Sequence, residues 1–248
     1  MARHIIAGLE LLTDDDILVK AEVYYKDFAN LLYLPGGNLF FAVLEEEEAS
    51  QAFSDFRNAR GRAQGFELLI KKSSGPSTGW LGYTYSSTEW KTAEHGWYAP
   101  KFDRRHTLNL VAEWMLSTKW HFSTAYTFAT GNPYTPVVAR YAPYVQSYWS
   151  DNQPQYSEYE DLLYGNLHSA RYPAYHRWDI SFSRRRPWGK RGTKETFIQI
   201  MNVLNHLNVY QYFYNERWDS RSGISQGIER LAIPMFPFFP TIGVRYEF

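Results

Sequence analysis

The stretch FFPTIGVRYEF, Phe238 to Phe248, closes the chain and decides how the rest of it is interpreted. From Thr241 onward its side chains alternate between two kinds. The apolar set is Ile242, Val244, Tyr246 and Phe248, and the other set is Thr241, Gly243, Arg245 and Glu247. Because successive side chains of a strand point to opposite faces, the stretch predicts a strand with one apolar and one polar face.

Composition narrows the class of protein. The chain has 248 residues, enough for one large all-β domain or two small ones. Aromatic residues make up 18%, which is high for a soluble enzyme. Its 26 basic and 26 acidic residues cancel. Without a basic field, nucleic acid is not an expected partner.

Two absences limit the chemistry and the mode of membrane contact. Cysteine is absent, which excludes disulfides, thiolate nucleophiles and cysteine metal sites. The sequence has no run of eighteen apolar residues, so a transmembrane helix is excluded on length. If the chain meets a membrane, it does so with strands.

The first residues do not have the pattern of a signal peptide. ARHIIAGLELL alternates like a strand and then meets Thr13-Asp14-Asp15-Asp16, where a signal peptide needs a longer apolar run and a cleavage site. We expect that the chain begins inside a larger protein or that its export sequence was removed.

The period-two pattern predicts nine antiparallel strands of the length, about 9 to 11 residues or more, that a tilted membrane strand needs. The eighth strand is interrupted at NVLNHLN, whose asparagines indicate a bulge rather than a helix. The strands are Arg3 to Leu12, Ile17 to Leu34, Arg62 to Lys72, Thr78 to Glu89, Arg105 to Leu116, Trp120 to Phe128, Ala174 to about Arg186, Thr193 to about Tyr214, and the closing strand.

The second strand shows why one face is expected to meet water. Val19, Ala21, Val23 and Tyr25 alternate there with Lys20, Glu22, Tyr24 and Lys26. Charges at this spacing would be ruinous in a two-sided dry core, but they are natural on a strand whose inner face is wet.

The connections favour a membrane barrel. Four are short (TDDD, SSGPS, STK and PWGKRG), and four are long, near Gly36, Lys91, Gly131 and Glu216, the last running from Asn215 to Pro237. Outer-membrane barrels have short periplasmic turns and long extracellular loops. Single-chain bacterial barrels have an even number of strands, whereas nine are predicted here. An open sheet in lipid would also leave unpaired backbone groups at its edges, at several kcal/mol each. The sequence therefore predicts the end of a larger barrel.

The order of several blocks resembles one family. HIIAGLELLTDDDILVKAEVYYKDFANLLYL, GRAQGFELLIKK, RRHTLNLVAEW, FATGNPYTP, RYPAYHRWDISFSRR, FIQIMNVLNHLNVYQYFYN and GVRYEF resemble, in order and spacing, the C-terminal barrel of TonB-dependent outer-membrane receptors. The resemblance covers residues 1–248, and no single block is specific.

The resemblance implies a fold, a location in the bacterial outer membrane, and partners. The fold class would be an all-β antiparallel transmembrane β-barrel, about nine strands forming the last part of a 22-stranded barrel. The expected partners are outer-membrane lipid, the barrel-assembly machinery and a bulky small-molecule or oligosaccharide ligand. TonB would act only through the missing N-terminal part, which includes the plug. Ile242, Val244, Tyr246 and Phe248 would be the C-terminal assembly signal.

The same resemblance implies uptake of a siderophore, cobalamin or an oligosaccharide by the parent protein. The long connection from Gly131 to Pro173 is the expected capture loop, because its aromatic rings could stack on a sugar or an aromatic chelator. The alternative is that these rings pack the loop on itself. The candidate residues are Tyr134, Tyr141, Tyr144, Tyr148, Trp149, Tyr156 and Tyr159.

Other candidate sites are weaker. Glu45 to Glu48 is more typical of a solvated loop than of a cation site. The seven histidines have no metal-ligand spacing. Arg184, Arg185 and Arg186 fit snorkelling side chains at the membrane edge better than a phosphate site. The sequence contains no phosphate loop, and its acidic residues show no recognisable pairing, so neither catalysis nor a cofactor is expected.

Two rival hypotheses stay open. A soluble carbohydrate-binding β-sandwich would also alternate, but it would dissolve without detergent. A small structural or adhesive outer-membrane barrel would recruit further strands by self-association, and cross-linking would then show a defined oligomer.

Overall fold

The chain is described by a computed structural model that covers residues 1–33, 56–141, 144–145, 155–156, 161–218 and 225–248. The described residues form strands and turns, without a helix. The order of the main sheet is β1-β2-β3-β4-β6-β7-β14-β15-β18, with each neighbouring pair antiparallel. The nine predicted strands are therefore confirmed in number and order.

Most predicted strand boundaries hold within a few residues, and β3 begins earlier than predicted, at Arg57. The nine strands are β1 (Ala2–Leu12), β2 (Ile17–Tyr33), β3 (Arg57–Lys72), β4 (Ser77–Thr92), β6 (His106–Met115), β7 (Trp120–Ala129), β14 (Tyr175–Trp188), β15 (Gly192–Met201) and β18 (Phe239–Glu247).

Shorter strands lie outside this path, most of them in small antiparallel pairs. β5 adds to the end of β4, and the others pair as β8 with β13, β9 with β12, β10 with β11 and β16 with β17. They are β5 (Gly96–Tyr98), β8 (Pro133–Tyr134), β9 (Val137–Tyr141), β10 (Tyr144–Val145), β11 (Gln155–Tyr156), β12 (Asp161–Tyr164), β13 (Ala170–Arg171), β16 (Val209–Trp218) and β17 (Ser225–Pro234).

The register aligns the apolar side chains of successive strands on one face. Residues directly opposite each other in an antiparallel pair point to the same side of the sheet. One uninterrupted row crosses five strands and consists of Trp114, Phe122, Phe182, Ile198 and Ile242. We call the side that holds this row the outer face.

The opposite, inner face carries charges that are paired with one another, across strands and within a strand. Glu195 lies opposite both Arg185 and Arg245, with N–O distances of 3.4 and 3.5 Å. On β2, Lys20 and Glu22 are 3.2 Å apart on this same face. These contacts are those of a surface that water can reach.

Burial excludes a dry interior between two sheets. Among the described residues, the buried hydrophobic side chains are three alanines, Ala59, Ala63 and Ala129. Ile242 is 75% exposed, and Ile198 is 50% exposed. The apolar face is therefore not covered by any of the described residues, which is the pattern of a surface made for lipid rather than a sandwich core.

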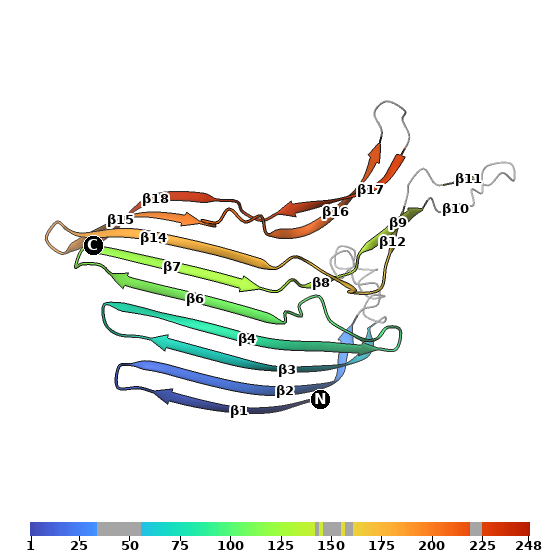
Figure 1. Ribbon diagram of the computed structural model, residues 1–248, viewed down its shortest axis with the longest axis horizontal. Coiled ribbons are helices and arrows are strands. Elements are labelled where there is room, and N and C mark those ends of the chain that lie inside the picture. Colours follow the sequence, from blue (N-terminus) through green and yellow to red (C-terminus); the bar gives the residue numbers. More distant parts are fainter. Residues whose placement is uncertain (34–55, 142–143, 146–154, 157–160, 219–224) are drawn as a thin grey trace.

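The two ends of the sheet differ as predicted. In Figure 1 the β1–β2, β3–β4, β6–β7 and β14–β15 turns lie at one end, together with the C-terminus, and the long connections leave from the other. The short turns use left-handed residues, among them Asp16 (φ 56°), Gly75 (φ 93°) and Gly189 (φ 64°). The loop asymmetry is therefore confirmed.

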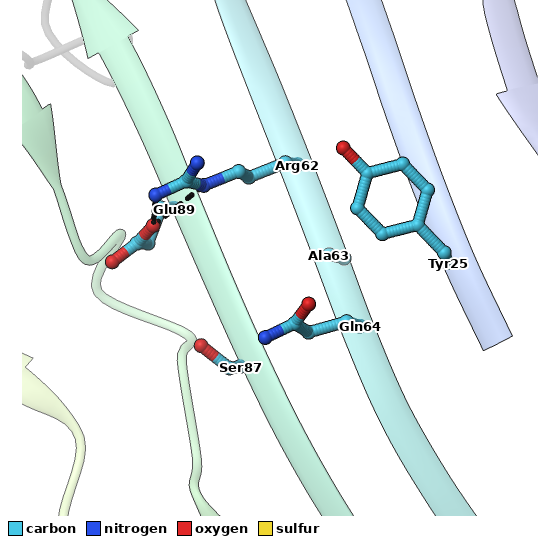
Figure 2. A pocket seen from close by; sticks show the side chains of 6 residues that line it. All are labelled: Tyr25, Arg62, Ala63, Gln64, Ser87 and Glu89. Carbon is cyan, nitrogen blue, oxygen red and sulfur yellow. Dashed lines mark hydrogen bonds and ion pairs between the residues drawn. The ribbon is translucent and has the colours of Figure 1, made fainter. Parts of the chain in front are cut away.

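The outer face changes from apolar to polar towards the long connections. Figure 2 shows Arg62, Gln64, Ser87 and Glu89 beside Tyr25, and the Arg62 Nη2 and Glu89 Oε2 atoms are 2.6 Å apart. All of these groups share the outer face with the apolar row. A change of this kind along the strand direction is what a membrane–water interface requires.

The eighth strand ends earlier than predicted, and the bulge within it is a wrong prediction. After Met201 the backbone takes left-handed φ values of 53° at Asn202 and 49° at Asn205. The buried Asn202 side chain donates to the carbonyls of His206 and Phe236 at 3.0 Å each. These bonds close a tight turn instead of inserting one extra residue into the ladder.

The segment after this turn belongs to a separate hairpin. β16 pairs with β17, so the predicted loop from Asn215 to Pro237 holds a strand. The Asn208 side chain bonds both backbone groups of His176 at 2.9 Å, which fixes the turn against the start of β14. The hairpin thus projects from the long-connection end of the sheet (Figure 1).

The main sheet is open within the described residues, since β1 and β18 each have one neighbour in it. Each edge presents a row of backbone N–H and C=O groups without a strand partner in the sheet. In lipid every such group costs several kcal/mol, so a stable membrane wall needs further strands at these edges.

Leu110→Arg and Val111→Arg test the assignment of the two faces. Leu110 lies on the outer face between Leu81 and Tyr126, and Val111 lies on the inner face between Trp80 and Ala125. An arginine facing lipid at mid-bilayer costs about 2 to 4 kcal/mol, whereas one facing water costs far less. A folded barrel runs at a different position from the unfolded chain on a gel of unheated samples. We expect Leu110→Arg to lower strongly the temperature at which heating the sample removes this folded band. An equal effect of Val111→Arg would contradict the assignment.

Candidate ligand-binding site

Three tyrosines from different segments pack together beyond the end of the sheet. Tyr134 belongs to β8, Tyr172 follows β13, and Tyr212 belongs to β16. Their ring centroids are 4.5 Å apart for Tyr134–Tyr172, 5.2 Å for Tyr134–Tyr212 and 5.0 Å for the stacked Tyr172–Tyr212 pair. With Arg230 they form what we call the tyrosine cluster.

Arg230 of β17 holds the cluster together. Its Nη1 donates to the Tyr134 hydroxyl at 3.0 Å, and its guanidinium lies 4.3 Å from the centre of the Tyr212 ring. A cation above an aromatic face is attracted by the ring quadrupole. The β16–β17 hairpin is thereby joined to the connection between β7 and β14.

A cavity of ≈ 320 Å³ lies against the cluster. Its described lining residues include no carboxylate, and Lys101 adds a positive charge to its wall. Its lining residues are Lys101, Asn132, Pro133, Tyr134, Thr135, His168 and Tyr172. The cavity therefore combines aromatic faces and hydrogen-bonding groups with a net positive charge.

Burial shifts the pKa of three groups that line the cavity towards their neutral forms. Desolvation raises the pKa of Tyr134, against the nearby Arg230 charge, and also raises the pKa of Tyr172. Desolvation lowers the pKa of His168, whose Nδ1 is 2.7 Å from the Ala99 carbonyl. Since a carbonyl only accepts, Nδ1 carries the proton, and Nε2 is an acceptor. The positive charge of the cavity wall comes from Lys101, and Arg230 adds a second cation beside Tyr134.

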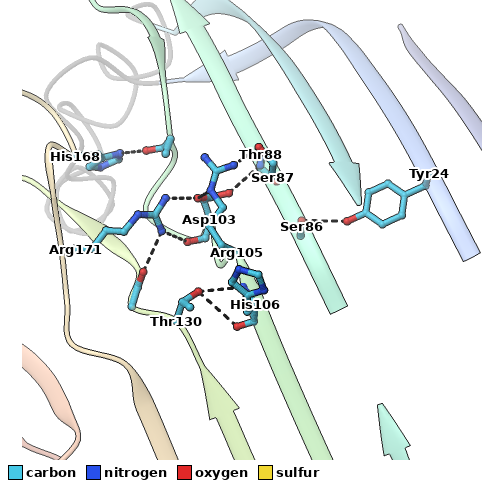
Figure 3. A network of polar contacts seen from close by, with 12 residues as sticks. Tyr24, Ser86, Ser87, Thr88, Asp103, Arg105, His106, Thr130, His168 and Arg171 are labelled. Atoms are coloured by element: carbon cyan, nitrogen blue, oxygen red, sulfur yellow. Dashed lines mark hydrogen bonds and ion pairs between the residues drawn. The ribbon is translucent and has the colours of Figure 1, made fainter. Parts of the chain in front are cut away.

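Asp103 fixes the connections around the cavity (Figure 3). Its fully buried carboxylate accepts hydrogen bonds from the Thr88 N–H at 2.8 Å and from Arg171 Nη2 at 2.5 Å, and Arg105 Nε is 3.1 Å away. Arg171 also donates to the Gly131 carbonyl at 3.0 Å. β4, the 99–105 segment and β13 are thus tied to one buried charge.

Of the predicted ligand residues that the structure describes, one lies in the cluster. Tyr134 packs against its neighbours and also lines the cavity, so its role in ligand binding stays a prediction. Tyr141 is 47% exposed on β9, outside the cavity. Tyr144 and Tyr156 are opposite each other in the β10–β11 backbone pair. Tyr148, Trp149 and Tyr159 lie outside the described residues, as does the acidic run at 45–48.

Tyr172, Tyr212, Arg230 and Asp103 are absent from the sequence-based candidates. One sequence signal could have found Tyr212. Tyrosines at 210, 212 and 214 recur at every second residue, which is the spacing of side chains on one face of a strand. No local pattern marks the other three, which act through partners far away in the sequence.

Within the part of the chain that the structure describes, no three histidine, aspartate or glutamate side chains are grouped to hold a metal ion. No helix among these residues is long and apolar enough to cross a membrane.

An open antiparallel sheet with a lipid-compatible outer face, a wet inner face, short turns at one end and long connections at the other is the wall of an outer-membrane-type β-barrel. The family model described as "TonB dependent receptor-like, beta-barrel" matches residues 4–203, most of the chain. The chain belongs to this family. Its members are outer-membrane proteins of Gram-negative bacteria.

A solved structure with the same fold is the ferric-catecholate import receptor Fiu from E. coli K12. It matches with a TM-score of 0.58 and 11% sequence identity over 99% of this chain. The chain spans 27% of the length of that receptor. No curated protein sequence matches this chain.

Asp103→Asn tests the role of the buried carboxylate. Removing one partner of a buried charge pair costs about 3 to 5 kcal/mol, and the change leaves Arg171 without its counter-ion. We expect a lower thermal midpoint and faster proteolysis between residues 131 and 173. The matched control is Glu94→Gln, which breaks the exposed Arg57–Glu94 pair and costs about 1 kcal/mol or less. Equal effects of the two changes would show that Asp103 has no special role.

Proposed function

We propose that this chain forms part of an outer-membrane receptor that captures a bulky, anionic, aromatic ligand of the iron–siderophore class for TonB-dependent uptake. The observation that carries the proposal is the tyrosine cluster, with Arg230 in it and Lys101 in the adjoining cavity, at the long-connection end of the barrel wall.

The chemistry of the cavity favours an anionic chelate over a neutral sugar. Aromatic side chains stack on flat ligand rings, and a sugar or a catechol would satisfy this equally. The charge separates the two classes of ligand. Lys101 lines the cavity, Arg230 contacts the Tyr134 hydroxyl beside it, and none of the described lining residues is an acid. An anionic ligand gains charge-assisted hydrogen bonds that a neutral sugar does not.

The solved relative is consistent with this class but carries little weight for the ligand. Its title names ferric-catecholate import, and its identity to this chain is 11%. At that level the likeness concerns the fold, so the ligand class rests on the cavity.

The proposal includes the location and the partners. The protein resides in the bacterial outer membrane, with its outer face against lipid and its long connections outside the cell. The barrel-assembly machinery reads Ile242, Val244, Tyr246 and Phe248, of which Ile242, Val244 and Tyr246 form the outer-face row of β18. Energy from TonB enters through parts of the receptor outside these residues. The chain itself carries out no catalysis.

Binding of two probes to protein extracted from outer membranes tests the ligand class. The first probe is the ferric tris-catecholate complex, a trianion, and the second is neutral maltohexaose. We expect the ferric complex to quench tryptophan fluorescence with saturation, whereas maltohexaose does not bind. Arg230→Gln removes a charge-assisted contact, so it weakens binding about tenfold or more.

The matched control for Arg230→Gln is Lys190→Gln, a loss of one charge in the exposed turn at the opposite end of the sheet. It leaves the affinity unchanged. Binding of maltohexaose with no binding of the ferric complex would replace the siderophore class by an oligosaccharide. Equal weakening by both variants would assign the effect to net charge rather than to the cluster.

A further inference from the structure

A second cavity lies on the outer face at the short-turn end, far from the tyrosine cluster along the strands. Its volume is ≈ 390 Å³, and its walls come from the ends of β7, β14, β15 and β18, which lie side by side in Figure 1. The residues that matter are Trp120, Phe182, Arg184, Arg186, Lys194 and Ile242.

The register settles which face these cations occupy. Arg184 lies opposite Trp120, and Arg186 lies opposite Lys194. Arg184 and Arg186 are separated from Phe182 by even numbers of residues, so they share its outer face. Arg185 points to the inner face, towards Glu195. Two of the three arginines considered for snorkelling therefore face outward, and Lys194 joins them.

No carboxylate of the described residues balances these three positive charges. Among the described residues, Arg184, Arg186 and Lys194 form no ion pair, and no acid lines the cavity. The buried Arg184 Nε has no hydrogen-bond partner. Like charges directly opposite each other, as at Arg186 and Lys194, destabilise a sheet unless an anion lies between them.

The cations are bordered by aromatic and aliphatic surface. The Arg184 guanidinium lies 4.9 Å from the Trp120 ring, and Lys194 Nζ lies 5.6 Å from Trp188 and 5.4 Å from Tyr246. Towards the middle of the strands the surface becomes mainly apolar, with Phe182 at 41% and Ile242 at 75% exposure. Positive charge and apolar surface thus meet within one cavity.

We propose that this cavity binds an anionic phospholipid of the membrane leaflet at the short-turn end. The phosphate lies among Arg184, Arg186 and Lys194, and the acyl chains run over Phe182, Ile198 and Ile242. Basic pockets at the membrane edge bind anionic head groups, and long cationic side chains reach the interface from an apolar surface. The inference rests on the membrane placement and is independent of the ligand at the tyrosine cluster.

The opposite rim of the sheet differs in charge. There, at the long connections, the outer-face Arg62 is already neutralised by Glu89 (Figure 2). A free phosphate ion would use the three cations but not the apolar surface below them. The combination of both features in one cavity favours a lipid.

Lipid retention tests the proposal. Outer membranes are fractionated first, and the protein that they contain is extracted in detergent and washed. The retained phosphatidylglycerol and phosphatidylethanolamine are then quantified by mass spectrometry, relative to the bulk membrane. We expect enrichment of phosphatidylglycerol in the unmodified protein. Replacing Arg184, Arg186 and Lys194 by Gln removes the enrichment, because each cation contributes about fivefold to the affinity for the anionic head group.

Arg185→Gln is the matched control, because it removes the same charge from the same strand on the inner face. It keeps the enrichment. A variant that fails to fold loses its heat-dependent gel shift; enrichment is then measured on the unmodified protein at low and high salt, where it must fall at high salt.

Three results overturn the proposal. The first is a ratio of phosphatidylglycerol to phosphatidylethanolamine on the unmodified protein that equals the ratio in the bulk membrane. The second is a loss of enrichment in Arg185→Gln as large as in the variant that lacks the three cations. The third is displacement of the lipid by millimolar inorganic phosphate alone. A protein absent from the outer-membrane fraction refutes the membrane placement itself, so the two failures are distinguishable.

Discussion

The whole structure depends on the hydrogen-bonded register between neighbouring strands. A one-residue slip between any two strands would move the apolar side chains of one strand to the wet face. The register observed here keeps Trp114, Phe122, Phe182, Ile198 and Ile242 in one row. In lipid the same backbone bonds are obligatory, since no water can replace them, and a single constraint therefore sets both the stability and the sidedness of the wall.

The two ends of this wall have different chemistry. At the long-connection end, one buried charge, Asp103, joins segments from β4 to β13, and the tyrosine cluster lies beyond it. At the short-turn end, Arg184, Arg186 and Lys194 leave positive charge on the lipid side. The first end is suited to capture a ligand from water, and the second to contact head groups of the membrane.

The sequence predicted the nine strands and their faces because alternation is a local property. Leu110 and Val111 are assigned to opposite faces by parity alone. The turn after Met201 was missed because asparagine is favoured both at bulges and at left-handed turn positions, and only the buried contacts of Asn202 distinguish them. The cluster was mostly missed because Tyr134, Tyr172 and Tyr212 meet through pairings of distant segments, which no local pattern encodes.

The most direct measurement of the central claim is the accessibility of single spin labels along β6. The chain has no cysteine, so one cysteine at a time can be introduced from His106 to Met115 in protein held in lipid. The structure predicts that access to oxygen, which dissolves in lipid, peaks at Leu108, Leu110, Ala112 and Trp114. Access to a water-soluble nickel chelate should peak at the alternate positions. Low access of both reagents to Leu108, Leu110, Ala112 and Trp114 would place these side chains in a dry protein core and contradict the account.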